Sequence, residues 1–436
     1  MSKWLVSVAV MAVLTTGCSF GNSAQTCSSD QQCQSGTSPG GRCEPGFGLC
    51  SFTDTVCPSG RRFGGLSGDK SGACVGGSPP IADAAIDVPP IDAAIDAPPD
   101  AQACFGTAPF TICLRNSPGP AILFSGITSI NTTTSDLCVA TVSGGDGYCV
   151  IAATSITINA GISVQAFGAK PLVLLASDSI TTGISSTIDV GSHRATLTAD
   201  EIVGAGADPA SCDAGMAPTT VNNTSGGGAG GSFIGPGGKG GQGSSNNNSA
   251  GVAGAIATAP VTTLRGGCPG QAGAGATNAA AGHGGGAVML IAGNSITINN
   301  GNVDASGEGG SGGQFGFAGG GGGGAGGMIV FDAPFITATT TTSEIFANGG
   351  GGGEGGNQNQ TGAPGFDPSD ETAATGGGAI GNGGNGGTGA GGTASATAGA
   401  NGAGAGGGGG GGGGTGLFKA PATAVLGSRV SPPPTR

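Results

Sequence analysis

The stretch Ser295–Gly301 reads SITINNG and Ser155–Gly161 reads SITINAG, so five consecutive residues are identical at an offset of 140 positions. Weaker copies of this unit surround both stretches. In each copy an isoleucine precedes a threonine, and a short apolar run lies upstream of the pair. The isoleucine column consists of Ile127, Ile156, Ile180, Ile296 and Ile336, and the threonine column consists of Thr128, Thr157, Thr181, Thr297 and Thr337. The two columns indicate an internal repeat.

The repeat predicts an all-β fold. Its runs are β-branched and alternate with period two, which is typical of strands. A unit of three short strands cannot bury its inward face alone, whereas stacked copies bury a continuous core. We therefore expect residues 104–425 to form a parallel β-helix, with the isoleucine column inside and the threonine column outside. Over about residues 121–425 the pattern resembles the passenger and filamentous-adhesin β-solenoids of bacterial surface proteins.

The composition argues against several functional classes. Of 436 residues, 99 are glycine and only 9% are charged, which is atypical of a globular enzyme. The net charge is −12 and the thirteen basic residues are scattered, so no basic patch is present for nucleic acid. Tyr148 is the only tyrosine and Trp4 the only tryptophan, which leaves few aromatic platforms for stacking on sugars.

The N-terminus has the features of an export signal. Lys3 precedes the apolar segment Leu5–Leu14, which is too short to span a bilayer. The following residues resemble a bacterial lipobox ending in Cys18, although Thr15 stands where leucine is usual. The resemblance implies a signal peptide over 1–17, a lipidated Cys18 and a tether over 18–26. Ser19 after the cysteine implies sorting to the outer membrane; the alternative is an ordinary secretory signal with an unpaired cysteine.

The other twelve cysteines are expected to form disulfides, as in an exported and oxidised chain. Residues 27–77 are predicted to be a small module that depends on such covalent links, because their apolar content is low. This module resembles one found at the start of many myxobacterial lipoproteins, and we favour a spacer over a binding role. Its six cysteines allow fifteen pairings. They are Cys27, Cys33, Cys43, Cys50, Cys57 and Cys74.

Three further pairs are expected from proximity in sequence. Cys104 and Cys113 are predicted to close a cap, and Cys138 and Cys149 to join the first two coils. Cys212 and Cys268 are predicted to fix the base of one long excursion.

Residues 78–103 are predicted to be a linker between the module and the β-helix. Proline pairs recur there beside five aspartates without a basic residue. Proline favours an extended chain and like charges repel, so we expect a semi-rigid stalk. Residues 426–436 are expected to be a disordered tail.

Glycine-rich insertions are expected at about 204–286, 307–327 and 349–415. Gly-Gly-x triplets within them match an extended left-handed helix with three residues per turn. The triplets resemble the glycine-rich domain of mycobacterial PE-PGRS proteins, whose PE domain is missing here, so that family's functions do not transfer. Ordered sheaves and disordered loops are both compatible with the pattern. Because such loops add no apolar core, deletion of Glu308–Gly324 is expected to destabilise less than Ile296→Ala.

No catalytic residue, metal site or cofactor is predicted. Asp189 and Asp304 occupy equivalent positions in two units, as a glycosidase carboxylate pair would, but an irregular coil is expected between them. His193 and His283 have no metal-ligand or nucleophile partner at a recognisable spacing. An enzyme would require at least three carboxylates and a lysine or arginine along one groove.

We therefore expect a non-catalytic surface protein with a structural or adhesive role in the envelope or extracellular matrix. The expected partners are the outer membrane, through the lipid, and polysaccharide or other surface proteins, but no nucleic acid. The surface-exposed face of that membrane is favoured over the periplasmic face. The alternatives are a β-helix polysaccharide lyase or glycoside hydrolase, and ice or surface binding through the outward threonine column.

Overall fold

The computed structural model of the chain describes residues 26–34, 40–67, 70–76, 103–196, 199–244, 249–275, 277, 279–338, 342–378 and 381–436. Cys18, the expected signal peptide and almost all of the expected linker lie outside the described residues. The chain divides into two compact units, Met1–Ala97 and Pro98–Arg436. None of the described residues forms a helix with the length and apolar character needed to cross a membrane.

The first unit is a small antiparallel sheet held by disulfides. It consists of η1 (Asp30–Cys33), β1 (Arg42–Glu44), β2 (Leu49–Thr53) and β3 (Arg61–Phe63), with the sheet order β1-β2-β3. Only a few side chains are buried there, Leu49 and Phe63 among them, so the covalent links compensate for a small core. The disulfides join Cys27 to Cys43, Cys33 to Cys50 and Cys57 to Cys74.

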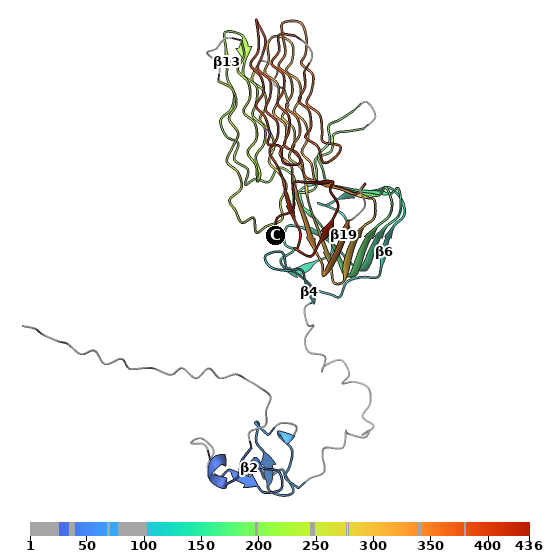
Figure 1. Ribbon diagram of the computed structural model, residues 1–436, viewed down its shortest axis with the longest axis vertical. Coiled ribbons are helices and arrows are strands. Elements are labelled where there is room, and N and C mark those ends of the chain that lie inside the picture. The colour runs from blue at the N-terminus through green and yellow to red at the C-terminus, as the bar shows by residue number, and fades with distance from the viewer. Residues whose placement is uncertain are drawn as a thin grey trace, which may run out of the picture. The chain divides into compact units, whose positions relative to one another are not determined.

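The second unit is built around two parallel sheets that curl toward each other (Figure 1). The six-stranded sheet has the order β23-β20-β17-β12-β10-β7. Its strands are β7 (Thr128–Asn131), β10 (Ser163–Phe167), β12 (Thr187–Asp189), β17 (Asn302–Asp304), β20 (Glu344–Phe346) and β23 (Val430–Ser431).

The nine-stranded sheet follows the path β21-β18-β15-β11-β16-β19-β22, and β6 and β9 extend it beside β11. Its strands are β6 (Ile122–Phe124), β9 (Cys149–Ile158), β11 (Leu172–Thr182), β15 (Ala287–Ala292), β16 (Ser295–Ile298), β18 (Met328–Asp332), β19 (Phe335–Ala338), β21 (Leu417–Lys419) and β22 (Val425–Leu426). Two small antiparallel groups complete the unit: β4 (Ala103–Phe105), β5 (Ile112–Leu114) and β8 (Thr141–Ser143), and the hairpin of β13 (Thr220–Val221) and β14 (Thr224–Ser225).

The repeated stretches lie in register on neighbouring strands. Ile180 pairs with Ile156 on one side and with Ile296 on the other, and Ile296 pairs in turn with Ile336. All four side chains are buried in one apolar core. The threonines beside them point away from this core: Thr157, Thr181 and Thr297 are half-buried and Thr337 is exposed.

The prediction that Ile127 and Thr128 are the first members of the two columns is wrong. Ile127 is 84% exposed, and Thr128 pairs with Val164 of the six-stranded sheet instead of aligning with Thr157. Ile122 takes the position opposite Ile156. Apolar residues upstream of Ile127 take the inward positions in this part of the chain. The Ile-Thr dipeptide that follows therefore lies outside both columns.

The apolar runs of β9, β11 and β15 are buried on both faces. One face lies in the core between the sheets, while Val150, Val173 and Met289 on the other face belong to a second apolar cluster. Ile112 and Phe233 are among the residues that cover this second face. Burial on both faces explains why these strands are continuously apolar instead of alternating.

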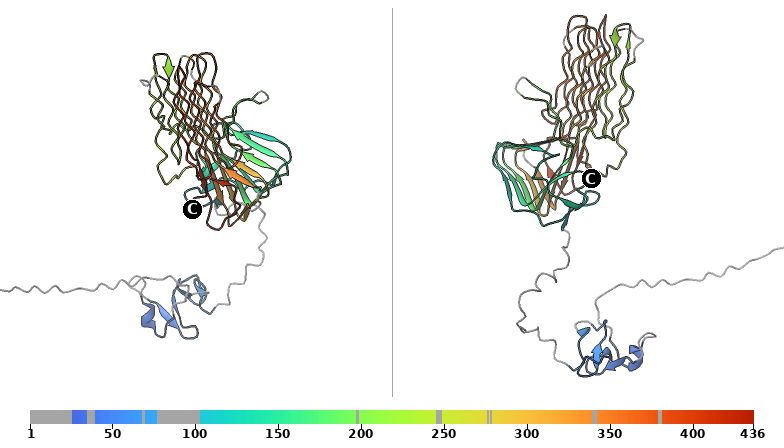
Figure 2. Two further views of the ribbon diagram at one scale, coloured as in Figure 1. Left: turned by 45° about the horizontal axis from the view of Figure 1, so that its top comes forward. Right: turned by 180° about the vertical axis from the view of Figure 1, so that it is seen from behind.

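The glycine-rich segments form an ordered bundle beside the sheets, which we call the glycine extension and define as residues 226–241, 307–327, 349–378, 381–389 and 399–416. Figures 1 and 2 show its long segments side by side. Backbone hydrogen bonds join them with a repeat of three residues. They run from Gly320 N to Gly408 O and from Gly323 N to Gly411 O, at 2.9 Å each, and likewise from Gly228 N to Gly320 O and from Gly231 N to Gly323 O. This is the period of an extended helix with three residues per turn.

The extension has almost no space for side chains between its segments. A Cβ on Gly322 would lie 1.9 Å from the carbonyl oxygen of Ala229, and one on Gly410 would lie 1.9 Å from that of Gly321. Glycine is therefore required by the close approach of neighbouring backbones. The disulfide between Cys212 and Cys268 closes the first excursion, and two more join Cys104 to Cys113 and Cys138 to Cys149.

Candidate functional site

The candidate site lies where the chain leaves the six-stranded sheet for the glycine extension. Gln165 of β10, Asp189 of β12 and Asp304 of β17 are direct neighbours on adjacent parallel strands. The expectation that an irregular coil separates the two aspartates is wrong. The described residues between β12 and β15 add no strand to either parallel sheet, so β17 is the next strand in register after β12 and brings Asp304 beside Asp189.

His193 places its imidazole between these two carboxylates. Its Nε2 lies 3.0 and 3.1 Å from the two oxygens of Asp189, and 3.9 Å from Oδ2 of Asp304. The backbone of His193 is fixed by two hydrogen bonds of 2.9 Å with Ile202. The side chain of His193 is 28% exposed, so solvent reaches the cluster from the side of the imidazole.

Both carboxylates are oriented by nearby donors. Oδ1 of Asp189 accepts a hydrogen bond from the amide of Gly191 at 3.0 Å, and Oδ2 accepts one from Nε2 of Gln165 at 3.1 Å. Oδ1 of Asp304 accepts a hydrogen bond from the amide of Ser306 at 2.7 Å. In both strands the donating amide comes two residues after the aspartate, so the same local turn holds each side chain.

Burial and neighbouring charges shift the pKa values of this cluster. Burial opposes a charged His193, but the hydrogen bond to Asp189 and the charges of Asp189, Asp304 and Asp367 outweigh it and raise the pKa of His193 to about 9. Burial, helped by the charge of Asp189, raises the pKa of Asp304 to about 7, although His193 and Ser306 act in the opposite direction.

A second charged group adjoins the first across the start of the extension. The amides of Arg194 and Gly309 donate to the two oxygens of Asp367 at 2.9 and 2.8 Å, so Asp367 ties two excursions together. Nε of Arg194 is buried, 3.8 Å from Oε1 of Glu308, and has no hydrogen-bond partner in the part of the chain that the structure describes.

His283 belongs to this second group. Its Nδ1 lies 2.5 Å from Oδ2 of Asp208, and its Nε2 lies 3.9 Å from Oε1 of the half-exposed Glu201. The hydrogen bond with Asp208 is the largest cause that raises the pKa of His283 above its ordinary value. Burial raises the pKa of Glu308 to about 7, against the amide hydrogen bond and charge of His283.

These arrangements are suited to binding a cation or holding a proton, and poorly suited to cleaving a sugar chain. Carboxylates and an arginine do come together, as an enzyme would require. However, Asp304 and Glu308 are only 6% and 4% exposed, so a glycosidic bond cannot reach both side chains. The enzyme hypothesis also requires a groove that exposes the carboxylates, and these two buried residues do not line one.

Asp189, Asp304 and the two histidines are recognisable candidates in the sequence, but nothing in the sequence predicts that they meet. Asp189 and Asp304 had been aligned, but the partners of the two histidines are distant in sequence. A useful signal would have been the spacing of Asp189, Gly191 and His193, because alternate residues of an extended chain lie on the same face.

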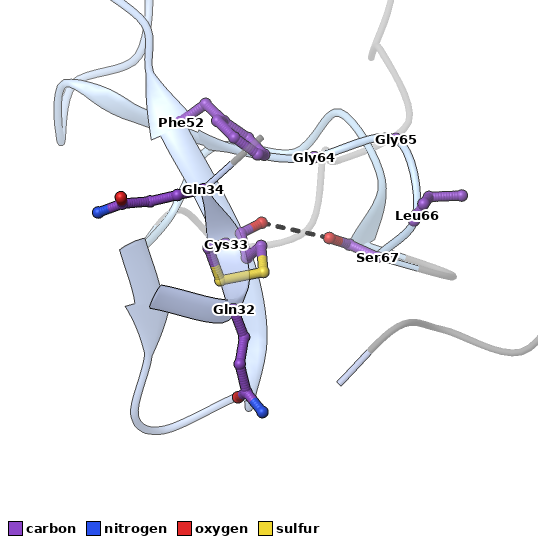
Figure 3. Close-up of a pocket in the computed structure, with 9 residues that line it drawn as sticks. Gln32, Cys33, Gln34, Phe52, Gly64, Gly65, Leu66 and Ser67 are labelled. Carbon is purple, nitrogen blue, oxygen red and sulfur yellow. Dashed lines mark hydrogen bonds between the residues drawn. A yellow bond between two sulfur atoms is a disulfide. The ribbon is translucent and has the colours of Figure 1, made fainter. Parts of the chain in front are cut away.

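A separate pocket lies in the disulfide module (Figure 3). Its volume is about 340 Å³, and Phe52, Leu66 and the disulfide between Cys33 and Cys50 are part of its lining. Ser67 Oγ donates a hydrogen bond of 3.4 Å to the Cys50 carbonyl oxygen at its edge. Among the described residues, the lining includes no titratable side chain for acid–base or metal chemistry.

Comparison of the chain with models of protein families, with curated proteins and with solved structures gives no match.

Proposed function

We propose that this chain is a lipid-anchored, non-catalytic protein of the outer-membrane surface with a structural or adhesive role. In this proposal Cys18 carries the lipid, and the disulfide module and the Asp/Pro linker separate the second unit from the membrane. The second unit then acts as a rigid body that contacts polysaccharide or other surface proteins. A face toward the periplasm is the alternative location.

The glycine extension is the observation that carries this proposal. Its segments are tied together by backbone hydrogen bonds, and close approach leaves little space for catalytic side chains between them. Residues with short side chains such as Asn385 and Thr388 lie along its segments, and their backbone carbonyl groups accept hydrogen bonds from neighbouring segments. A stiff projection with a small-residue surface fits a spacer or contact element better than it fits an active site.

We also propose that the two parallel sheets are successive coils of a β-helix. The support is the register of the strands. Each turn of chain contributes two strands to the nine-stranded sheet and one to the six-stranded sheet in the same order, as in β15, β16 and β17 followed by β18, β19 and β20. Each strand also pairs in parallel with its counterpart in the neighbouring coil. Such stacking makes a narrow, stable scaffold from which long insertions can leave at one corner.

The membrane anchor has a direct test. Cys18→Ser should leave the protein without lipid, so it should move from the detergent phase to the aqueous phase on phase separation. Unchanged partitioning of the variant would show that Cys18 is not the anchor.

The structural or adhesive role is tested by incubating the mature protein with envelope and matrix polysaccharides. The proposal predicts saturable retention of the polymer without new reducing ends or unsaturated products. Release of such products would instead support the β-helix lyase or glycoside hydrolase that is the alternative.

The threonine column supports a second candidate, binding of ice or another flat surface. Thr157, Thr181, Thr297 and Thr337 are aligned on adjacent parallel strands and point outward. Threonine is also simply a favourable strand residue, so the alignment by itself is weak support. Thermal hysteresis of the purified protein would favour this candidate, and its absence would remove it.

A further inference from the structure

We propose that Asp189, His193 and Asp304 bind a divalent transition-metal cation at the junction of the six-stranded sheet and the glycine extension. This site is independent of the structural or adhesive role. It uses the only imidazole that the described residues place against two carboxylates of adjacent parallel strands.

The distances between the donor atoms fit a metal. Nε2 of His193, one oxygen of Asp189 and one oxygen of Asp304 all lie within 4.8 Å of one another. Nε2 is 3.0 Å from Asp189 Oδ1 and 3.9 Å from Asp304 Oδ2. Metal–ligand bonds of about 2.0–2.2 Å hold neighbouring donor atoms roughly 3.0–3.5 Å apart. Only a small movement of the Asp304 side chain is needed to bring all three donor atoms within bonding distance of one metal ion.

Asp304 provides the observation that points to a ligand. The residue is 6% exposed, and its Oδ1 is engaged by the Ser306 amide. Its Oδ2 faces His193 Nε2 at 3.9 Å, which is beyond hydrogen-bonding distance. A carboxylate buried beside a second carboxylate is costly to ionise, and a cation bound between them would compensate for that cost.

The remaining contacts pre-orient the ligands. Gln165 and Gly191 each donate a hydrogen bond to Asp189, and the Ser306 amide fixes Asp304. Partners of this kind orient metal ligands, and their loss typically weakens metal binding by about 10–100-fold. The partial exposure of His193 leaves a path for the ion.

The donor set selects the class of cation. Imidazole nitrogen suits Zn²⁺, Cu²⁺, Ni²⁺ and Fe²⁺, whereas Ca²⁺ and Mg²⁺ prefer oxygen ligands alone. One nitrogen with two carboxylates therefore favours a first-row transition metal over Ca²⁺. The neighbouring Arg194 does not compete for the site's charge, because its side chain is directed to Glu308 and the Gly309 carbonyl oxygen.

A second triplet of potential ligands offers an internal control. Glu201, His283 and Glu308 also have donor atoms within 4.8 Å of one another. There, however, Glu201 is half-exposed, and Glu308 already accepts the His283 amide and lies beside Arg194. This triplet is the weaker candidate, and His283→Gln tests it separately.

The experiment is calorimetric titration of the chelator-treated, mature protein with Zn²⁺, and with Ca²⁺ in parallel. The proposal predicts one Zn²⁺ site and weaker binding of Ca²⁺. His193→Gln and Asp304→Asn should each weaken Zn²⁺ binding by more than about 100-fold, the upper end for residues that only orient a ligand. Asp178→Asn, the same chemical change at an exposed position of β11, and His283→Gln should leave binding unchanged.

The proposal would be overturned by no saturable Zn²⁺ binding, by tighter binding of Ca²⁺ than of Zn²⁺, or by full binding in both His193→Gln and Asp304→Asn. Loss of binding in His283→Gln alone would place the site in the other triplet and would equally overturn it. X-ray absorption of the Zn²⁺-loaded wild-type protein needs no variant. One or more nitrogen neighbours among oxygens at about 2.0–2.1 Å is the expected result, and a shell of oxygen alone contradicts it.

Discussion

The parallel sheets and the glycine extension are both densely packed, but opposite kinds of atoms hold them together. In the sheets, buried side chains such as Ile156, Ile180 and Ile296 stack in columns. In the extension, backbone amides and carbonyl oxygens of glycines bond directly across segments. In the sheets, each buried apolar side-chain atom adds to the stability of the fold. In the extension, the close approach of neighbouring backbones leaves no space for added side-chain atoms. The two regions should therefore respond in opposite ways to the gain and loss of a methyl group.

The largest effect is expected from removing atoms in the sheets. Ile296→Ala leaves a cavity in the middle of the isoleucine column, which typically costs about 2–5 kcal/mol of folding free energy. The melting temperature of the variant should fall clearly. An unchanged melting temperature would mean that the column is not what stabilises the second unit.

Adding one carbon in the extension should cost nearly as much. Gly322→Ala places a Cβ against the Ala229 carbonyl oxygen, and such overpacking typically costs about 1–3 kcal/mol or more. We expect the extension to become sensitive to a broad-specificity protease while the sheets stay protected. The control is Gly126→Ala, where a Cβ meets no atom within 4 Å. Equal resistance of the two variants would show that the segments are not closely packed.

The structure changes the effect on stability that we expect from deleting Glu308–Gly324. This segment bonds to several others, for example from Gly353 N to Gly321 O and from Gly228 N to Gly320 O. Its removal would break the bundle at its centre, so the deletion is now expected to disorder the extension while Ile296→Ala weakens the sheets.

A smaller effect is expected from pH at the junction of the two regions. The pKa of His193 is raised from 6.5 to about 9, so the folded protein binds the proton of this imidazole more tightly than the unfolded chain does. This stabilisation is complete below pH 6.5 and is lost as the pH rises through 9. The raised pKa of Asp304 acts in the same direction between about pH 4 and 7. In chelator, the wild-type melting temperature should therefore fall from mildly acidic to alkaline pH.

His193→Gln isolates the contribution of the imidazole. The raised pKa of His193 corresponds to at most about 3 kcal/mol of folding free energy. Because the side chain is partly exposed, solvent screening reduces this contribution to roughly 1–2 kcal/mol. The variant should be less stable than wild type at pH 6 and similar to it above pH 9. A difference between the two proteins that does not change with pH would contradict the assigned charge interaction.

The smallest effect is expected on the outward face of the sheets. Thr297→Ala should change the folding free energy by no more than about 0.5 kcal/mol, because the side chain lies outside the apolar core. Its melting temperature, measured beside that of Ile296→Ala, checks the inward and outward assignment of neighbouring residues. A loss as large as that of Ile296→Ala would place Thr297 inside.

The sequence predicted the strand positions of the sheets better than their ends. Ile156, Ile180, Ile296 and Ile336 could be aligned because each must fill the same inward position. Ile127 could not be excluded from the column, since the dipeptide alone does not reveal that Ile122 and Phe124 already fill the inward positions of that coil. Periodicity identifies a repeat, but packing decides which copies take part.

The candidate site depended on information that periodicity does not contain. Alignment of equivalent units put Asp189 and Asp304 in one column, yet their adjacency depends on the described residues between β12 and β15 adding no strand to either parallel sheet. The contact of His193 with both aspartates depends on the corner after Gly191. The triplet repeat likewise permitted both ordered and disordered segments, because glycine pairs allow close packing and also favour flexibility.

The most direct test of the difference between the two regions is native-state hydrogen exchange, read by mass spectrometry, on the wild-type protein and on Gly322→Ala. Amides of residues 319–326 and 407–414 should be protected in the wild type, as are those of Leu172–Ala176, because each group is hydrogen-bonded across segments or strands. In Gly322→Ala, protection should be lost in the extension and retained in the sheets. Exchange of residues 319–326 in the wild type at the rate of an unstructured chain would contradict the account.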